Sequence, residues 1–273
     1  MQKYILSIMA LFLLLVSCDN SNSPEVVNYP IELRTAQTDV LSELDSLTKE
    51  MNEFADSLKT TDIQLNEEKV RARLLKFVDD YDYIDEALIM SDKGILNLIE
   101  PAKYKESEGT DVSSQEQIVR LIKEKKPVTS KIFKVVEGYY SIVYIIPVIV
   151  DGNIKVSIAV LIDPSRLFKP ILEKISKDKD FTFFVIENTG MVLYDPDPSE
   201  IGLNTITDPY YQDYPEVVAA CTKIANGEEG QTAYTFYNTG MSEMDKFDVY
   251  WKSIKFIDSD WKIVYKIEKA VAI

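Results

Sequence analysis

The sequence predicts an α+β protein in which one long N-terminal helix is followed by two similar units. Apolar residues recur every three or four positions along residues 38–58, which is the spacing of a long amphipathic helix. Residues 86–101 and 183–202 then repeat one pattern: an apolar run, a polar turn with a glycine, and a second apolar run. Each repeat is followed by a helical segment and three β-rich runs, so each unit should form a five-stranded antiparallel sheet with helices on one face.

The composition supports two folded units and argues against several functions. Of the 273 residues, 46% are hydrophobic, which is enough for a substantial core. The formal net charge of −15 disfavours binding to nucleic acid, which needs a cationic surface. The chain has no histidine, so it lacks the usual proton-transfer residue and the histidine ligands of common zinc sites. We therefore expect no catalysis, no metal and no cofactor.

The first residues, MQKYILSIMALFLLLVSC, have the layout of a secretion signal. Lys3 gives a positive start, and the apolar run from Tyr4 to Val16 is too short to span a bilayer comfortably. LVSC, which ends at Cys18, resembles the lipobox of prokaryotic lipoproteins, in which the signal is cut before the cysteine and the cysteine is acylated. We expect residues 1–17 to be a lipoprotein signal peptide; a simple cleaved signal and an uncleaved anchor are the alternatives.

Residues 18–34 begin with a polar stretch that contains proline and should form a flexible tether. If Cys18 carries lipid, Cys221 is the only remaining thiol, so no internal disulfide can form. Cys221 lies in a helical pattern, which favours a small buried core residue over a reactive thiol. Because no later apolar segment has membrane length, we expect the chain to end outside the cytoplasm.

The predicted helix over residues 35–60 presents an apolar stripe with alternating steps of four and three residues. Packing on the protein's own body would cover this stripe, and dimerisation through it, giving a homodimer, is the alternative. The stripe consists of Val40, Leu44, Leu47, Met51, Phe54 and Leu58.

The first unit should cover residues 61–163 and begin with a second helical stretch. A strand–turn–strand at 84–99 is followed by a helix at 113–126 and by three long β runs joined at Glu-Gly and Asp-Gly turn signals. The three runs are expected at 128–136, 139–150 and 153–162.

A linker helix over residues 164–180, in which Pro164 suits the first turn, should lead into a second unit at 181–273. The second unit repeats the order of the first, with a strand–turn–strand, a helix and three β runs. Its elements are expected at 181–195, 214–226, 230–237, 246–257 and 260–267.

This order of elements resembles the double-Cache family, the extracytoplasmic PAS-like sensor domains of prokaryotic receptors. The resemblance covers about residues 35–267 and rests on MSDKGILNLIEP, on the segment from KKPVTSKIF to VSIAVLIDP, and on VIENTGMVLYDPDPSEIGLN. It implies a membrane-distal unit at 61–163 and a membrane-proximal unit at 181–273. In that family the distal unit usually binds a small ligand between its sheet and the helix and loops that cover it.

The resemblance and the residue types point to five candidate ligand-binding residues, Tyr139, Tyr140, Ser141, Tyr144 and Asp163. Alternation along a strand puts Tyr140 and Tyr144 on one face and Tyr139 and Ser141 on the other. Tyrosines give apolar walls with polar tips, which suit a small-molecule pocket, and core packing is the alternative. Asp163 could instead be only the N-cap of the following helix. The arginine–tryptophan–tyrosine cluster of one amino-acid-binding subgroup is absent, so we do not predict an amino acid ligand.

Two acidic segments of the second unit offer weaker candidates. DPYYQDYPE, at 208–216, could line a second pocket, or could only cap the helix that follows. DPDPSEIG, at 195–202, lacks the spacing and the bidentate glutamate of a calcium loop, so we do not predict a metal there.

We therefore expect a lipid-anchored, extracytoplasmic protein that binds or senses a small molecule and presents its ligand state to a receptor or signalling partner. Anchoring through Cys18 would place it on the periplasmic face of the inner membrane or on the outer cell surface. The alternative is a pocket-less module of the same fold that assembles through the 38–58 stripe.

Overall fold

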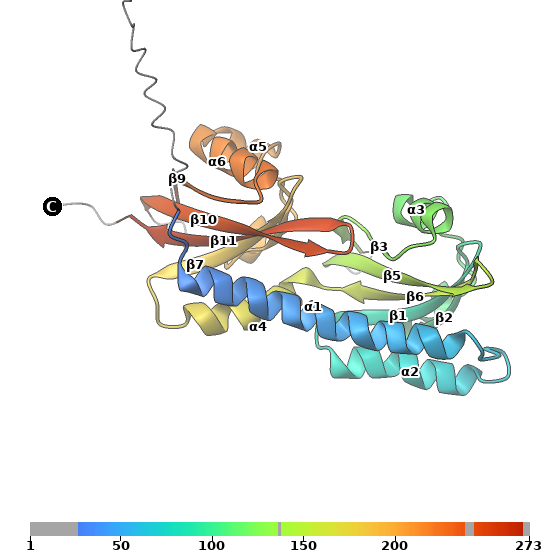
Figure 1. The fold of residues 1–273 in the computed structure, drawn as a ribbon. Coiled ribbons are helices and arrows are strands. Elements are labelled where there is room, and N and C mark those ends of the chain that lie inside the picture. The colour runs from blue at the N-terminus through green and yellow to red at the C-terminus, as the bar shows by residue number, and fades with distance from the viewer. Residues whose placement is uncertain (1–26, 136–137, 238–242, 270–273) are drawn as a thin grey trace, which may run out of the picture.

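In the computed structural model, the described residues are 27–135, 138–237 and 243–269, so Cys18 and the predicted signal segment lie outside them. The described chain forms two antiparallel sheets, a long helix that runs beneath both, and shorter helices on both sides (Figure 1). This confirms the predicted α+β class with two similar units. Within these ranges, no helix has the length and apolar character needed to cross a membrane.

The two sheets have the same strand order, with one additional short strand in the distal sheet. The order is β2-β1-β6-β5-β3 in the distal unit, where β4 also pairs with β5, and β8-β7-β11-β10-β9 in the proximal unit. The repeated sequence pattern therefore encodes the hairpins β1–β2 and β7–β8, which occupy equivalent places. The strands are β1 (Ile84–Ser91), β2 (Leu96–Glu100), β3 (Val128–Thr129), β4 (Phe133–Lys134), β5 (Tyr140–Val150), β6 (Asn153–Ile162), β7 (Phe181–Glu187), β8 (Val192–Tyr194), β9 (Glu229–Tyr237), β10 (Met244–Phe256) and β11 (Ser259–Glu268).

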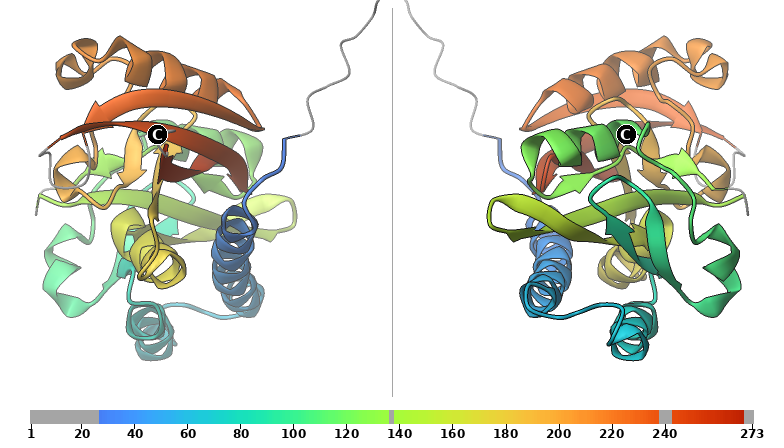
Figure 2. Two further views of the ribbon diagram at one scale, coloured as in Figure 1. Left: turned by 90° about the vertical axis from the view of Figure 1, so that its left-hand side faces the viewer. Right: turned by 90° about the vertical axis from the view of Figure 1, so that its right-hand side faces the viewer.

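Helices cover both faces of each sheet, which adds a layer to the single helical face expected from the sequence (Figure 2). One side of both sheets is covered by the long helix and the linker helix, and the opposite side of each sheet is covered by the unit's own helix. The first side has α1 (Ile31–Leu58), α2 (Glu67–Asp80) and α4 (Pro164–Ser176); the other has α3 (Glu116–Glu124) over the distal sheet, and α5 (Pro209–Gln212) and α6 (Pro215–Asn226) over the proximal sheet.

The whole apolar stripe of α1 is buried inside the protein. Val40, Leu44 and Leu47 are fully buried, and they belong to one continuous core that includes Ile146 of the distal sheet and Ile254 of the proximal sheet. Because the protein's own sheets cover the stripe, it is not available for pairing with a second copy. The structure therefore favours packing on the protein's own body over dimerisation through this stripe.

The run predicted as one strand at 128–136 is broken into β3 and β4, both of which pair with β5. Between them, Ile132 N donates a hydrogen bond to Glu187 Oε1 of the proximal unit at 2.9 Å. The backbone N–H of Ile132 thus donates to a carboxylate of the proximal unit and not to a neighbouring strand, as it would in a regular sheet. Local sequence shows no sign of this partner.

The proximal unit encloses a pair of carboxyl groups near α5 and α6. Asp195 and Glu200 line a cavity of about 20 Å³ together with Tyr211 and Lys266, which is room for about one water molecule. Tyr211 Oη donates to Glu200 Oε2 at 2.8 Å, so the 208–216 segment does line a cavity. Burial, and then the charge of Glu200, raise the pKa of Asp195 to about 7.

Leu44→Ala should destabilise the whole protein rather than one unit. Removal of this fully buried side chain should cost about 2–5 kcal/mol. Because the core is continuous, we expect a single calorimetric transition, lowered by about 2–4 °C per kcal/mol. Asp45→Ala on the exposed face of α1 should change the free energy of unfolding by less than about 0.5 kcal/mol. Two separate transitions, of which only one moved, would contradict a shared core.

Asp195 should make the protein less stable as the pH rises. Its pKa is raised from 3.8 to about 7 in the folded state, so between these values the folded state holds a proton that the unfolded state has lost. The melting temperature should therefore fall from about pH 5 to about pH 8. Asp195→Asn keeps an acceptor for Asp197 N and removes the ionisation, so its melting temperature should fall less over this range.

From about pH 5 to about pH 8, the free energy of unfolding of the parent protein should fall by about 1–2 kcal/mol more than that of Asp195→Asn. The exposed Asp213→Asn serves as the control and should reproduce the profile of the parent protein. A parent protein that gains stability over this pH range would show that Asp195 is not held protonated.

Candidate functional site

β5 places the candidate residues on its two faces, as alternation along a strand predicts. Tyr140 and Tyr144 pack in the core that contains α1, whereas Val143 packs in the cluster that contains α3. Ser141 has the same parity as Val143 and belongs to the α3 side, and Tyr139, which directly precedes β5, lies beside Tyr104. The structure therefore does not bring all the candidate residues around one cavity.

Tyr144 and Tyr140 take the core-packing role that the sequence left open. Tyr144 is 0% exposed, its ring lies edge-on to Phe256 at a centroid distance of 4.9 Å, and its hydroxyl lies 3.4 Å from Thr48 Oγ1. Tyr140 packs against the proximal unit at Gly202, where a Cβ atom would lie 2.0 Å from Tyr140 Cζ. Both tyrosines therefore pack against elements outside the distal sheet, and neither lies on the face of that sheet that α3 covers.

Ser141 and Asp163 lie at the same end of the distal sheet, and both already have partners within the protein. Ser141 Oγ donates to Ile162 O at 3.1 Å and is completely buried. Asp163 is the N-cap of α4, where its Oδ1 accepts from Arg166 N at 3.2 Å and its Oδ2 pairs with Arg166 Nε at 3.0 Å. The N-cap interpretation is confirmed, and a ligand role for Asp163 stays a prediction.

The structure adds Asp85, which sequence reasoning missed. Asp85 lies in β1 beside β6, and its Oδ1 forms an ion pair with the same Arg166 that pairs with Asp163. Its Oδ2 is buried and has no hydrogen-bond partner among the described residues. The only sign of Asp85 in the sequence is its place at the start of an apolar strand, in YIDEAL. Many other acidic residues of this chain have a similar position, so this sign alone could not single it out.

Tyr139 lies in the same cluster, and its hydroxyl is also unsatisfied. Tyr139 Oη is buried beside the hydroxyl of Tyr104 but makes no hydrogen bond of normal geometry to a described residue. Burial, then Tyr104, then the charge of Asp85 raise the pKa of Tyr139. We refer to Asp85, Tyr104, Tyr139, Asp163 and Arg166 as the distal cluster.

The distal cluster has two buried atoms with free hydrogen-bonding capacity. Asp85 Oδ2 can accept a hydrogen bond from a ligand, and the Tyr139 hydroxyl can donate or accept one. Arg166 is already committed to Asp85, to Asp163 and to the Asp82 carbonyl, 2.6 Å away. Buried polar groups without partners are costly, so an unpaired carboxylate oxygen and hydroxyl in one place are a reason to expect a ligand.

Neither a metal site nor a reactive thiol is evident in the described part of the chain. No group of three or more cysteine and acidic side chains there is arranged to hold a metal ion. Cys221 is 2% exposed in α6, and its burial raises the pKa of the thiol to about 12. The thiol is therefore protonated at neutral pH, as the buried-core interpretation predicts.

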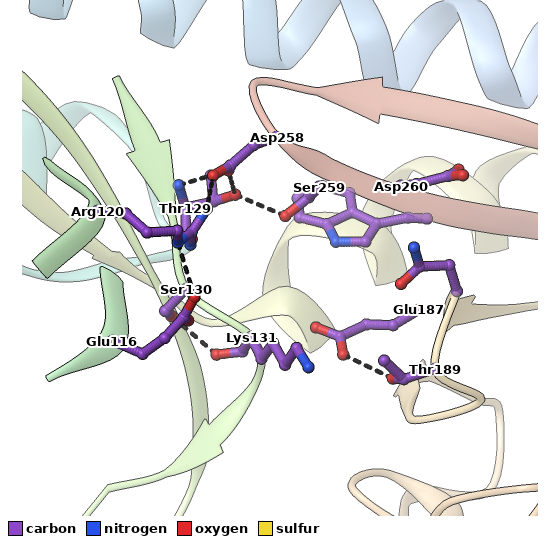
Figure 3. A pocket seen from close by; sticks show the side chains of 12 residues that line it. Glu116, Arg120, Thr129, Ser130, Lys131, Glu187, Thr189, Asp258, Ser259 and Asp260 are labelled. Atoms are coloured by element: carbon purple, nitrogen blue, oxygen red, sulfur yellow. Dashed lines mark hydrogen bonds and ion pairs between the residues drawn. The ribbon is translucent and has the colours of Figure 1, made fainter. Parts of the chain in front are cut away.

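Carboxylates of the proximal unit bind the edge of the distal sheet (Figure 3). Asp258 Oδ1 accepts from Thr129 N at 2.8 Å and from Thr129 Oγ1 at 2.5 Å, and Asp258 Oδ2 pairs with Arg120. With the Glu187–Ile132 bond, these contacts form the inter-unit junction. A cavity of about 340 Å³ lies within it, at the lower end of the usual range for small-molecule sites. None of the five candidate residues lines this cavity.

The distal part of the chain matches a known sensor family. Residues 42–164 match the family model described as "HK/GC/Chemotaxis protein-like, sensor domain". This range contains most of α1, the whole distal unit and the Asp163 cap. A search of curated protein sequences finds no match.

Solved structures of sensor domains share the whole two-unit architecture. An extracellular ligand-binding receptor from Desulfohalobium retbaense is 23% identical with a TM-score of 0.65, over 88% of this chain but only 41% of that chain. The ligand-binding domain of the amino acid chemoreceptor PctC from Pseudomonas aeruginosa, in complex with GABA, is 15% identical with a TM-score of 0.58, over 85% and 94%. The periplasmic sensory domain of the Campylobacter jejuni chemoreceptor Tlp1 is 13% identical with a TM-score of 0.61, over 87% and 92%. The resemblance predicted from the sequence is confirmed, because this chain has the fold of the double-Cache extracytoplasmic sensor domains and its distal part matches a sensor-domain family.

Proposed function

We propose that this protein is a lipid-anchored, extracytoplasmic small-molecule sensor that has no chemistry of its own and presents its ligand state to a partner protein. The observation that carries the proposal is the pair of buried, unpaired polar atoms, Asp85 Oδ2 and Tyr139 Oη, in the distal unit. They lie within the range that matches the sensor family. They also lie in the distal unit, which is the unit that the family resemblance implies as the ligand-binding one.

The distal cluster suits a small polar ligand that carries at least one hydrogen-bond donor. Asp85 Oδ2 can only accept, so the ligand group facing it must be an N–H or O–H. Arg166 balances much of the charge of Asp85 and Asp163, so the ligand does not have to carry a full positive charge. Two structural neighbours were solved with GABA and with L-Gln, which supports small polar molecules as the class.

The position of the chain ends supports anchoring on the side of the proximal unit. The first and last described residues lie at the same end of the molecule, beside the proximal sheet (Figure 1). Tyr29 is held there, with its ring 4.3 Å from Lys252 Nζ. A tether that leads from a lipid on Cys18 into this end would leave the distal unit facing away from the membrane.

One observation favours the pocket-less alternative. The centre of the distal sheet on its α3 side is filled by aliphatic side chains, among them Ile118 and Leu121 of α3 and Ile145 of β5. A ligand would therefore have to bind at the end of the sheet, at the distal cluster. The surface assigned to assembly in that alternative is the α1 stripe, which the sheets already cover.

Tyr139→Phe and Asp85→Asn should weaken ligand binding, whereas Tyr144→Phe should not. The first two changes alter Tyr139 Oη and Asp85 Oδ2, two atoms that make no hydrogen bond to a described residue, whereas Tyr144 lies on the α1 side of β5. Loss of one hydrogen bond to the ligand should reduce affinity about three- to tenfold. The measurement is a thermal-shift screen of amines, amino acids and hydroxylated metabolites with the full-length protein in detergent, followed by calorimetric titration of any hit.

The comparison of Tyr139→Phe with Tyr144→Phe distinguishes an effect on binding from an effect on stability. If Tyr144→Phe and Tyr139→Phe weakened a hit equally, the effect would be one of general stability rather than of binding at the distal cluster. If no compound in the screen shifted the melting temperature, the sensing proposal would be wrong for this chemical class.

Cys18→Ser should abolish membrane attachment through lipid. In a bacterial host, the parent protein should fractionate with membranes and show the mass of a chain that begins at an acylated cysteine. The Cys18→Ser protein should show neither the added acyl mass nor cleavage before residue 18. Cys221→Ser is the matched control, because it removes the other cysteine and should leave the modification in place. An acyl mass that persists in the Cys18→Ser protein would contradict the anchor.

A further inference from the structure

The acidic groups around the inter-unit cavity already have partners in the protein. Glu116 pairs with Arg120 Nε at 2.8 Å. Asp258 is bound by Thr129 and Arg120, as described above. Glu187 accepts from Ile132 N at 2.9 Å and from Thr189 Oγ1 at 3.0 Å. Asp260 is bound by Lys262 Nζ at 2.8 Å and by Lys255 Nζ at 2.7 Å. These carboxylates therefore have little need of a cationic ligand.

Two strong donors on the cavity wall are not satisfied. Trp261 is 1% exposed and lines the cavity, and its Nε1 is buried without a hydrogen-bond partner among the described residues. Lys131 is exposed and lines the cavity from the segment between β3 and β4, and no hydrogen bond or ion pair of its ammonium group occurs within the described ranges. Its charge acts on Glu187, and Figure 3 shows the Lys131 side chain extending across the gap towards Glu187.

We propose that this cavity is a second ligand site, which binds a small organic carboxylate between the two units. An indole N–H can only donate, and an ammonium group can only donate, so both require acceptor atoms from the ligand. A carboxylate supplies several acceptor positions and gains a charge-assisted hydrogen bond from Lys131. The cavity volume of about 340 Å³ fits a molecule of a few carbon atoms with its hydrating water.

A carboxylate in this position would link the two units directly. Lys131 belongs to the distal unit, and Trp261 belongs to β11 of the proximal unit. The ligand would therefore reinforce the junction that Asp258 and Glu187 already make. The site is separate from the distal cluster, because the two share no lining residue.

The test is calorimetric titration of the full-length protein in detergent with acetate, lactate and succinate, each beside its uncharged amide. At least one carboxylate should bind saturably and its amide should not. Lys131→Gln should weaken this binding about tenfold or more, because it removes a charge-assisted hydrogen bond. Trp261→Phe keeps the ring and removes only the N–H, and should weaken binding about threefold or more.

Two control variants separate this site from others. Lys126→Gln removes an exposed charge near the end of α3 and should not change the affinity. Tyr139→Phe alters the distal cluster alone and should also leave carboxylate binding unchanged. Because Lys131 is exposed, Lys131→Gln should fold even if Trp261→Phe does not.

Three results would overturn the proposal: no saturable binding of any of the three carboxylates, equal binding of the amides, or binding that survives Lys131→Gln. A carboxylate affinity that fell with Tyr139→Phe and not with Lys131→Gln would assign the ligand to the distal cluster and would also overturn it. Failure of the second site leaves the sensing proposal standing, since that rests on Asp85 and Tyr139.

Discussion

The shared core along α1 is the constraint on which the rest of the structure depends. The stripe of this helix is buried against both sheets, and each such aliphatic side chain contributes about 1.5–3 kcal/mol by leaving water. Separation of the two units would expose the part of the stripe that packs on one of the two sheets. The two sheets therefore cannot act as independent domains, and any relative movement must leave the α1 interface intact.

The inter-unit junction is much weaker than the α1 core. It consists of the carboxylates of Asp258 and Glu187 on groups of the distal edge, and a single contact of this kind contributes about 1–3 kcal/mol. The junction therefore contributes less than the α1 core to holding the two units together. The distal cluster is linked to the proximal unit by another route, because Arg166 lies in the first turn of α4, and α4 packs on β7 and β8. A ligand bound at Asp85 would therefore affect the first turn of α4 through Arg166.

Features that depend on local residue spacing could be predicted from the sequence, whereas features that depend on contacts between distant residues could not. The repeated hairpin, the buried stripe and the two faces of β5 could all be predicted, because each depends on residue spacing alone. The break at Ser130–Ile132 could not, since Ile132 N there donates to a glutamate of the other unit. Asp85 and Trp261 were missed for the same reason, because each is notable only for an atom that the folded protein leaves without a partner.

The turn that carries Asp258 is itself strained, which affects the balance at the junction. Ile257 has φ of 57°, a left-handed conformation that β-branched residues strongly avoid and that costs on the order of 1–3 kcal/mol. This cost is similar to the gain from one of the carboxylate contacts that the turn makes possible. The strain therefore offsets about one of the several contacts that Asp258 and Glu187 make across the junction. A ligand bound at the junction would add to these contacts, while the larger α1 core holds the two units together whether or not a ligand is bound.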